Sequence, residues 1–587
     1  MKYSVKYSLF IILILLLSIT LTACDTLFFN ICGGSGTTDS TDDLPDDGSD
    51  DDGSDDDAFD ETQYWWDNIK YSETDIVFMM TKLSGNSDLS SGCERYLAGE
   101  TDSVCDKKID SLIAARNRDA YEKTKVNVTY KYYDFSPELY GLSRAYQVIE
   151  REILSSGKNT PDIYCNSTAD LLACSLKGCF ANIYSKMHGE NDYKGANHFN
   201  FNSGGYMASF MSSLTLDHMK LFIIASDYFI DLTRSIYVIP VNLKLFRKIA
   251  KEAYPEVTEP TIDTLYREVK PCECSNEDEG TECTNDCTIG GWTYDRIIEL
   301  SHAVHNSFGT DKNENDTIGF ALGADPLSAA GLLYSSSVYI IEKKWNKEER
   351  KYNYAYHEEN PALENLFQKI SVMMNSPGIK CISEVDSEGE NNSLLKIRDQ
   401  FCNDNVLFGG IVLLGHLEDE EYQNMLADEN GGLGILPVPV MKTADKYTTQ
   451  LHTGANAGAI RCNTANFVQC SAFLHYQSTQ SSLVLNEYYK DVLIGKNSDE
   501  EDPRSANIEM IRYIRHNLYT CMDANFEEAI GYINEDVEAF NIKNRYYSLL
   551  VDNIYVYGDI KVKYGELQPS WAEALVKLEK EYEKLPD

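Results

Sequence analysis

The sequence has little positive charge for its length. Its 587 residues contain 52 lysines and arginines against 93 aspartates and glutamates, which gives a formal net charge of −41 at pH 7. No basic stripe interrupts this excess of acidic residues. Because such a chain repels a phosphate backbone, we expect no nucleic-acid partner.

The sequence also lacks the short motifs that mark common catalytic sites. It contains no G-x-S-x-G, no H-E-x-x-H and no phosphate-binding glycine loop. His302 and His305 are spaced for one helix face, but the glutamate of a zinc protease is absent. Carboxylates are too numerous to single out an acid and base pair. We therefore predict a binding protein, not an enzyme, with no catalytic residue and no cofactor.

Only one apolar run approaches membrane-spanning length, and it lies at the N-terminus. Lysines precede the run Leu9 to Leu17, and the sequence Leu21-Thr22-Ala23-Cys24 follows it. This order predicts a signal peptide over residues 1–23. It resembles the bacterial lipobox, which implies that lipidated Cys24 holds the protein on the cell membrane, facing the extracellular or periplasmic side. A plain secretory peptide or a signal anchor is the alternative.

Residues 24–63 are poor in apolar side chains. From Gly33 to Asp60 the chain is mostly Gly, Ser, Thr and Asp, which bury too little surface to fold and repel one another. We expect an extended acidic tether. The repeated DDGSDDD suggests calcium, but the glycine and terminal glutamate that an EF-hand loop needs at fixed positions are absent.

Cysteine is abundant, with 16 copies. Lipidation of Cys24 leaves an odd number, so at least one cysteine is free or intermolecular, and Cys32 in the tether is the candidate. An oxidising exterior favours disulfides among the others. Proximity in the sequence suggests the pairs Cys93 with Cys105, Cys174 with Cys179, Cys381 with Cys402 and Cys462 with Cys470.

Four more cysteines fall in an acidic insertion, residues 271–288. Cys272, Cys274, Cys283 and Cys287 could close a tetrahedral zinc site with four thiolates. Their spacing differs from the usual zinc knuckle, and an oxidising compartment couples such thiols. We predict two disulfides and no metal, with zinc as the alternative.

The first part of the folded body alternates strands and helices. Strands are predicted over Asp75–Met80 and Lys125–Tyr132, helices over Asp110–Thr124 and Tyr140–Leu154, and a third, short buried strand before Asn166. This βαβαβ order predicts a parallel sheet, whose ligand sites lie in loops at the carboxyl ends of the strands.

A later stretch organises the rest of the chain. The runs Ile411–Leu414 and Leu433–Leu436 are short, apolar and flanked by glycine, as buried strands are. Pro437-Val438-Pro439 then removes backbone donors and fixes φ, so the chain leaves the sheet in an extended conformation. Such a segment suits a crossing between two lobes. The polar, aromatic and glycine-rich segment Tyr447–Ile460 follows, and we expect it beside a binding cleft.

The order of these motifs resembles that of extracellular solute-binding proteins of ABC importers, family 1, the maltose-binding type. The resemblance runs from about Asp75 to Lys561 and rests on TPDIYCNS, IYVIPVNLKLFRKIA, GGWTYDRIIELS, FGGIVLLG and GILPVPV. In that family the run matching Tyr237–Phe246 is the first crossing between lobes, and its asparagine, here Asn242, leads into a helix. A lysine usually follows that asparagine closely, whereas Leu243 intervenes here.

The resemblance implies an α/β, two-lobed, periplasmic-binding-protein-like fold of type II. Each lobe would be a mostly parallel sheet flanked by helices, and hinge strands would join the lobes. We predict lobe 1 over 64–236 with 446–502, and lobe 2 over 237–445 with 503–587. A monomer would then close about its hinge on a small solute, most readily a sugar or oligosaccharide, and present it to an ABC permease.

Candidate ligand contacts come from loops expected at this cleft. A sugar needs aromatic faces and amide or carboxylate groups, and tyrosine alone contributes 39 residues. The candidates are Ser84, Asn86, Thr168, Tyr206, Asp227, Tyr228, Asp325, Tyr334, His416, Tyr447 and Asn456. Tyr206 and Tyr228 could instead fill an interface, Asp325 could initiate a turn before Pro326, and His416 could lie on the surface. Trp292 is assigned to packing beside a helix start, with Thr293 as that helix's N-cap.

A different class of function fits the anchor and the tether equally well. A surface adhesin or a sensory receptor lipoprotein would bind a protein or a signal ligand instead of transporting a solute. Closure of the lobes on a solute would favour transport or sensing, whereas a rigid molecule with a large apolar patch would favour adhesion.

Overall fold

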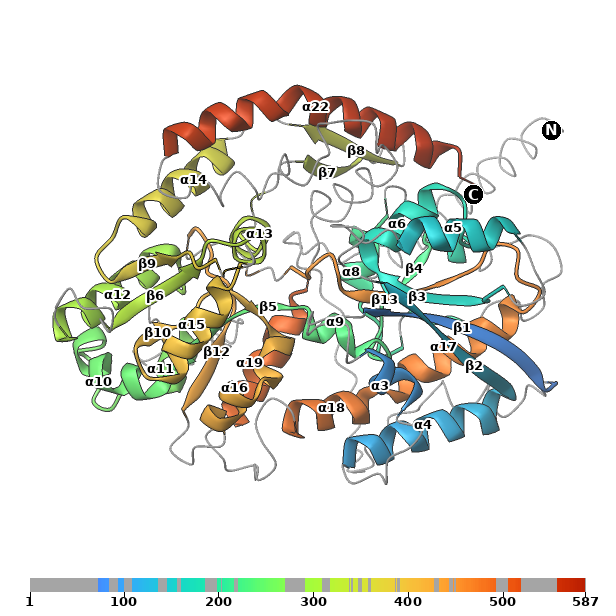
Figure 1. Cartoon of the computed structure of the whole chain (residues 1–587), viewed down its shortest axis with the longest axis horizontal. Helices are drawn as coiled ribbons and strands as arrows, with labels where there is room; N and C mark the ends of the chain where they lie inside the picture. The colour runs from blue at the N-terminus through green and yellow to red at the C-terminus, as the bar shows by residue number, and fades with distance from the viewer. Residues whose placement is uncertain are drawn as a thin grey trace, which may run out of the picture.

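A computed structural model gives the three-dimensional structure of the chain (Figure 1). It describes residues 72–83, 93–99, 108–135, 145–155, 160–184, 198–201, 203–215, 220–269, 291–308, 317–336, 338, 341–346, 351–356, 361–385, 387, 391–426, 432–442, 447, 450–491, 505–518 and 557–585. The signal peptide, Cys24, the tether and the loop 271–288 lie outside the described residues.

The first lobe is built on a sheet with the strand order β2-β1-β3-β13-β4. Its strands are β1 (Thr74–Leu83), β2 (Val126–Phe135), β3 (Ile163–Ser167), β4 (Ile223–Ile224) and β13 (Asn456–Ile460). Its helices are α3 (Cys93–Ala98), α4 (Lys108–Thr124), α5 (Ala145–Ser155), α6 (Thr168–Leu176), α8 (Ala208–Ser213), α9 (Ile230–Arg234), α17 (Phe467–Gln480) and α18 (Ser482–Asp491). Strand β1 pairs in parallel with both β2 and β3, so the predicted βαβαβ unit is confirmed.

The second lobe is built on a sheet with the order β11-β5-β10-β6-β9, and β12 pairs with β5. Its strands are β5 (Tyr237–Asn242), β6 (Ile318–Gly323), β9 (Ile379–Ile382), β10 (Val406–Phe408), β11 (Val412–Leu413) and β12 (Leu433–Leu436). Around it lie α10 (Leu243–Ala253), α11 (Ile262–Arg267), α12 (Tyr294–Phe308), α13 (Pro326–Tyr334), α14 (Pro361–Met374), α15 (Ser393–Cys402), the 3₁₀ helix η3 (Leu414–Glu418), α16 (Glu420–Leu426) and α19 (Ser505–His516). A separate hairpin joins β7 (Ile341–Asn346) to β8 (Lys351–Tyr356).

Among the described strands, each of these sheets is parallel apart from one strand. In the first lobe β13 runs antiparallel to β3 and β4, and in the second β5 runs antiparallel to β10, β11 and β12. Strands β5 and β13 both lie where the chain enters one lobe from the other. Each of them therefore runs opposite to the other strands of its sheet, whose carboxyl ends face the seam. The predicted fold class, two α/β lobes with mostly parallel sheets joined by extended crossings, is confirmed.

The second crossing behaves as its prolines predict. After β12 the chain runs through Pro437 and Pro439 without joining a ladder, then pairs at Val440 with Thr293. Trp292, which is fully buried, donates its indole N–H to the carbonyl oxygen of Pro437 at 2.8 Å. The packing role predicted for this tryptophan is therefore confirmed, and it fixes the start of the crossing.

Two predicted helix starts are also confirmed. Oδ1 of Asn242 accepts hydrogen bonds from the backbone N–H groups of Lys244 and Leu245, both at 3.0 Å, and so caps α10. The hydroxyl oxygen of Thr293 accepts from the N–H of Arg296 at 3.3 Å at the start of α12. The intervening Leu243 thus leaves the turn after the first crossing intact.

Helix α22 (Tyr557–Glu583) reaches both lobes and arches across the top of the molecule in Figure 1. Near its start Lys561 pairs with Glu364 of α14 at 3.0 Å. Near its end the hydroxyl of Tyr582 donates to the carbonyl oxygen of Lys220 in the first lobe at 2.9 Å. The helix is therefore a second physical link between the lobes, besides the crossings.

The disulfide predictions that fall on described cysteines are wrong. Cys174, Cys179, Cys402, Cys462 and Cys470 are free thiols, so none of the three pairs among them and Cys381 forms. For the pair Cys462 with Cys470 the reason is position, because Cys470 is buried in α17 while Cys462 is exposed on a loop. The pair Cys93 with Cys105 lies outside the described side chains.

The described residues include neither a helix that could span a membrane nor a cluster that could hold a metal ion. No described helix combines the length and apolar character needed to span a bilayer. The described histidines, cysteines and carboxylates form no group of three or more that could hold a metal ion. The four cysteines of the loop 271–288 lie outside the described residues, so their disulfides and the alternative zinc site stay predictions.

Candidate functional site

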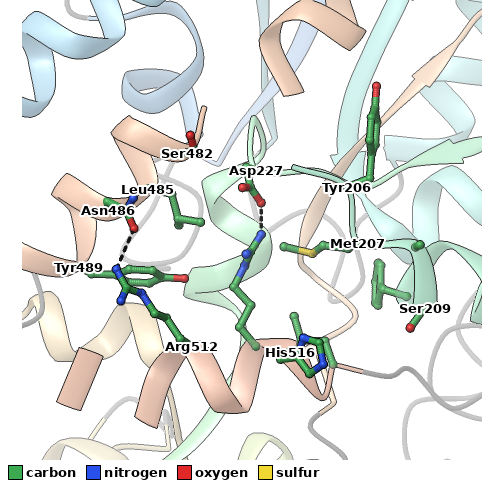
Figure 2. Close-up of a pocket in the computed structure, with 14 residues that line it drawn as sticks. Tyr206, Met207, Ser209, Asp227, Ser482, Leu485, Asn486, Tyr489, Arg512 and His516 are labelled. Atoms are coloured by element: carbon green, nitrogen blue, oxygen red, sulfur yellow. Dashed lines mark hydrogen bonds and ion pairs between the residues drawn. The ribbon is translucent and has the colours of Figure 1, made fainter. Parts of the chain in front are cut away.

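A cavity of about 480 Å³ lies at the seam between the lobes (Figure 2). The first lobe contributes α8, the loop after β4 and α18, and the second contributes α19. The lining residues are Tyr206, Met207, Ala208, Ser209, Phe210, Asp227, Ser482, Leu485, Asn486, Tyr489, Arg512, Arg515, His516 and Leu518. The volume is within the range of small-molecule sites, roughly 300–1,000 Å³.

Helix α19 brings basic groups to this cavity from the second lobe. Asn507, near its start, donates to the carbonyl oxygen of Leu433 in β12 at 3.0 Å and accepts from the hydroxyl of Tyr266 in α11. These bonds fix the helix on the second lobe. Arg512, Arg515 and His516 are spaced i, i+3 and i+4 along it, so they share the face that lines the cavity.

One ion pair crosses the cavity. Nη2 of Arg515 donates to Oδ1 of Asp227, the contact drawn from Asp227 in Figure 2. Asp227 is buried, and this burial raises the pKa of its carboxyl group, while the guanidinium of Arg515 counteracts the rise. The pair joins the loop after β4 to α19 and therefore ties one lobe to the other.

Aromatic residues form part of the lining. Tyr489 is only 2% exposed, and burial raises the pKa of its phenol to about 12. Tyr206 is oriented by α17, because its hydroxyl is hydrogen bonded to Nδ1 of His475 at 2.7 Å. Figure 2 shows that this hydroxyl points away from the other labelled residues, so the cavity receives the base of the side chain and its backbone.

A buried polar network continues along the seam. Nε of Arg234 in α9 donates to Glu418 at the end of η3 at 2.7 Å, and Nη1 donates to Asp231 at 3.0 Å. The hydroxyl of Tyr488, the neighbour of Tyr489, donates to Glu418 at 2.6 Å. Arg234 is 3% exposed, so its charge depends on these carboxylates. The lobes thus meet through two ion pairs that flank one stretch of α18.

The structure places two of the predicted contacts at the cavity, one in this network and two in hydrogen bonds to backbone groups. Tyr206 and Asp227 line the cavity. Asn456 donates to Oδ2 of Asp231 from its side chain at 2.7 Å. Thr168 donates to the carbonyl oxygen of Thr453 at 3.0 Å, which ties α6 to the segment before β13. Nδ1 of His416 accepts from the N–H of Leu413 at 3.4 Å, and burial lowers the pKa of this imidazole to about 4.

Three predicted contacts have structural roles away from the cavity. Tyr228 is fully buried in the first lobe, with its hydroxyl 3.2 Å from that of Tyr130. Asp325 caps α13 by accepting from the N–H of Ser328 at 2.9 Å, as its position before Pro326 allows. Tyr447 donates to the carbonyl oxygens of Trp292 and Glu268 at 2.9 and 3.2 Å.

The remaining predicted contacts cannot be placed. Ser84 and Asn86 lie outside the described residues, and so does the side chain of Tyr334.

The contribution of α18 and α19 was not predicted from the sequence. The available signal was charge: Arg512, Arg515 and His516 form a basic i, i+3, i+4 pattern in a strongly acidic chain. The prediction placed ligand contacts in loops at strand ends, where ligand sites of α/β sheets lie. This basic pattern belongs to no such loop.

The arrangement suits binding of a polar molecule. Guanidinium, imidazole, carboxylate, amide and hydroxyl groups meet around one cavity, together with apolar side chains. The described lining contains no cysteine and no more than one carboxylate, so it lacks the paired acids of a glycosidase.

No protein-family profile matches the sequence, and no curated protein matches it either. Solved structures do match in part. The sugar-binding protein MalE of Xanthomonas citri is 10% identical, over 87% of this chain and 100% of that one, with a TM-score of 0.49. The galacto-N-biose-/lacto-N-biose I-binding protein of a Bifidobacterium longum ABC transporter is 11% identical, over 87% and 99%, with a TM-score of 0.46.

A third match is the GacH receptor of Streptomyces glaucescens, which is 12% identical over 87% of this chain and 100% of that one, with a TM-score of 0.44. The chain is thus similar, at low identity, to solved solute-binding proteins.

Proposed function

We propose that the protein captures a small solute between its two lobes and delivers it to an ABC permease. The observation that carries the proposal is the cavity at the seam, which is lined by both lobes. A solute there contacts groups that separate when the lobes open, so binding favours the closed form. A sugar or oligosaccharide is the solute that the mixture of aromatic, amide, carboxylate and hydroxyl groups fits best.

The lipid anchor is part of the same proposal. The apolar run before Cys24 and the acidic tether after it support attachment to the outer face of the cell membrane. The tether that the sequence predicts would let the lobes reach a permease in the same membrane. The order of motifs along the chain, which resembles family 1 solute-binding proteins, supports transport over adhesion.

Thermal-shift screening tests the proposal. The chain from residue 24 onward, with Cys24 replaced by serine, is screened against mono- and oligosaccharides, amino acids and peptides. A true solute raises the melting temperature, because a ligand at about 100 times its Kd stabilises the folded state by about 2.7 kcal/mol.

The variant Asp227→Asn then locates the site. We expect it to weaken the identified solute about tenfold, the effect of a charged hydrogen bond. Asp399→Asn is the matched control, because Asp399 is 61% exposed on α15, outside the cavity. If no solute in the panel stabilises the protein, or if Asp227→Asn leaves the affinity unchanged, the proposal is wrong.

A further inference from the structure

We infer that the cavity selects a saccharide that carries an anionic group, a uronic acid or a sulfate ester, and that Arg512 and Arg515 recognise this group. The inference rests on the proposed function and adds a substrate class to it. It starts from the contrast between the chain, with its net charge of −41, and the described lining, with two arginines and one carboxylate.

The two arginines differ in how fully their donors are used. Arg512 is half exposed; it donates to Glu509 at 2.8 Å and to Oδ1 of Asn486 at 3.3 Å. Both partners are weak competitors, since Glu509 is itself 58% exposed and the amide is neutral. An anion in the cavity can therefore replace the amide and gain a charge-assisted hydrogen bond.

Arg515 is the second arginine that can contact the anion. Its Nη2 is bound by Asp227, but its Nε is buried and has no hydrogen-bond partner among the described residues. Because this Nε is enclosed, a ligand oxygen meets the exposed part of the Arg515 side chain, which is 22% exposed and lines the cavity. The fork of an arginine fits the two oxygens of a carboxylate or a sulfate ester better than a lone hydroxyl.

The rest of the lining fits a sugar ring that bears the anion. Asp227 holds Arg515 in place and retains lone pairs for ring hydroxyls. Ser482 and Asn486 add neutral donors and acceptors from α18. The anion would sit on the α19 side of the cavity and the hydroxyls on the α18 side.

Isothermal titration with matched sugars tests the inference. The probes are galactose, galacturonate and galactose 6-sulfate, with galactobiose and digalacturonate as the longer pair, so that only the group at C6 changes. We expect the acidic members to bind at least about tenfold more tightly than the neutral ones, as one charge-assisted contact provides. Their affinity should fall with added salt, whereas that of neutral sugars should not.

Arg512→Gln is the decisive variant, because its half-exposed side chain can be changed without burying an unpaired charge. It should weaken binding of the anionic sugar and so reduce the preference for it to within about threefold. Arg118→Gln, on the exposed face of α4, is the matched control. Arg515→Gln should lose more of this preference. If Arg515→Gln does not fold, Arg512→Gln alone tests the inference.

The outcomes separate the two proposals. Preferential binding of galacturonate or of the sulfate ester supports the inference and identifies which anion is recognised. Neutral sugars that bind as tightly as acidic ones overturn it while the solute-capture function stands. If none of these sugars binds, this inference is wrong, and the thermal-shift panel decides separately whether the solute-capture function stands.

Discussion

At the scale of single residues, polarity alone does not distinguish a ligand contact from a structural hydrogen bond. Tyr447 and Asp227 were both candidates, yet Tyr447 holds the crossing to Trp292 and Glu268, whereas Asp227 faces the cavity. Each side chain is buried in the folded chain. Their partners differ: Tyr447 bonds to backbone carbonyl oxygens, whereas Asp227 pairs with Arg515, a charged side chain of the other lobe.

His475 makes stability depend on pH. It is fully buried beside Tyr206, and burial lowers its pKa from 6.5 to about 4. The unfolded chain therefore binds a proton more readily than the folded chain, so this contribution to stability is full above pH 6.5 and is lost as the pH falls toward 4. Urea unfolding at pH 7.5 and 4.5 should show a loss of up to about 3 kcal/mol from this residue.

The variant His475→Gln should flatten that part of the pH profile, and the partly exposed His305→Gln on α12 serves as control. Equal slopes for the wild type and His475→Gln would contradict the prediction.

At the scale of elements, a close backbone approach sets the position of Tyr206. Gly205 has φ of +92°, and a Cβ built there would lie 2.2 Å from the carbonyl oxygen of Ser478 in α17. Only glycine allows the chain before α8 to lie this close to α17. That approach is what brings Tyr206 within hydrogen-bonding distance of His475.

Two glycine substitutions should therefore have opposite effects. Gly205→Ala should destabilise the protein by at least about 2 kcal/mol, because it combines a left-handed conformation with a clash against backbone. Gly565→Ala, in the exposed middle of α22 with no atom near its Cβ, should stabilise that helix by about 0.5–1 kcal/mol. Chemical denaturation measures both, and a neutral Gly205→Ala would show that the loop can move aside.

At the scale of the whole molecule, buried charges hold the lobes together. Arg234 with Glu418, and Asp227 with Arg515, each join one lobe to the other. Helix α22 links them again through Glu364 and Lys220. The lobes therefore attract each other without a ligand, and the proposed closure on a solute would start from this attraction.

Removing one of these charges should open the molecule. Glu418→Gln weakens the pair with the buried Arg234, and a loss of about 1.4 kcal/mol shifts the population of open molecules tenfold. X-ray scattering should then give a larger radius of gyration without solute than for the wild type. Glu299→Gln is the control, since Glu299 pairs with Arg296 within one lobe. If both variants scatter alike, the seam does not depend on this ion pair.

The sequence by itself determined what depends on local pattern. Apolar runs and helical periodicity predicted the strands β1, β2, β3 and β12; Pro437 and Pro439 predicted the crossing; and Asn242 and Thr293 predicted two helix starts. These features follow from the steric and hydrogen-bonding properties of a few neighbouring residues, so they are the same wherever the segment lies.

Only the tertiary structure decided which distant groups meet. The ion pair of Asp227 with Arg515 spans 288 positions of sequence, and the bond of Arg234 to Glu418 spans 184. No local pattern encodes such distances, because they depend on how two lobes pack across a seam. For the same reason, cysteines that are neighbours in the sequence remained thiols. The cavity likewise lies between α18 and α19, whereas the strand order predicted a site at the loops after the strands.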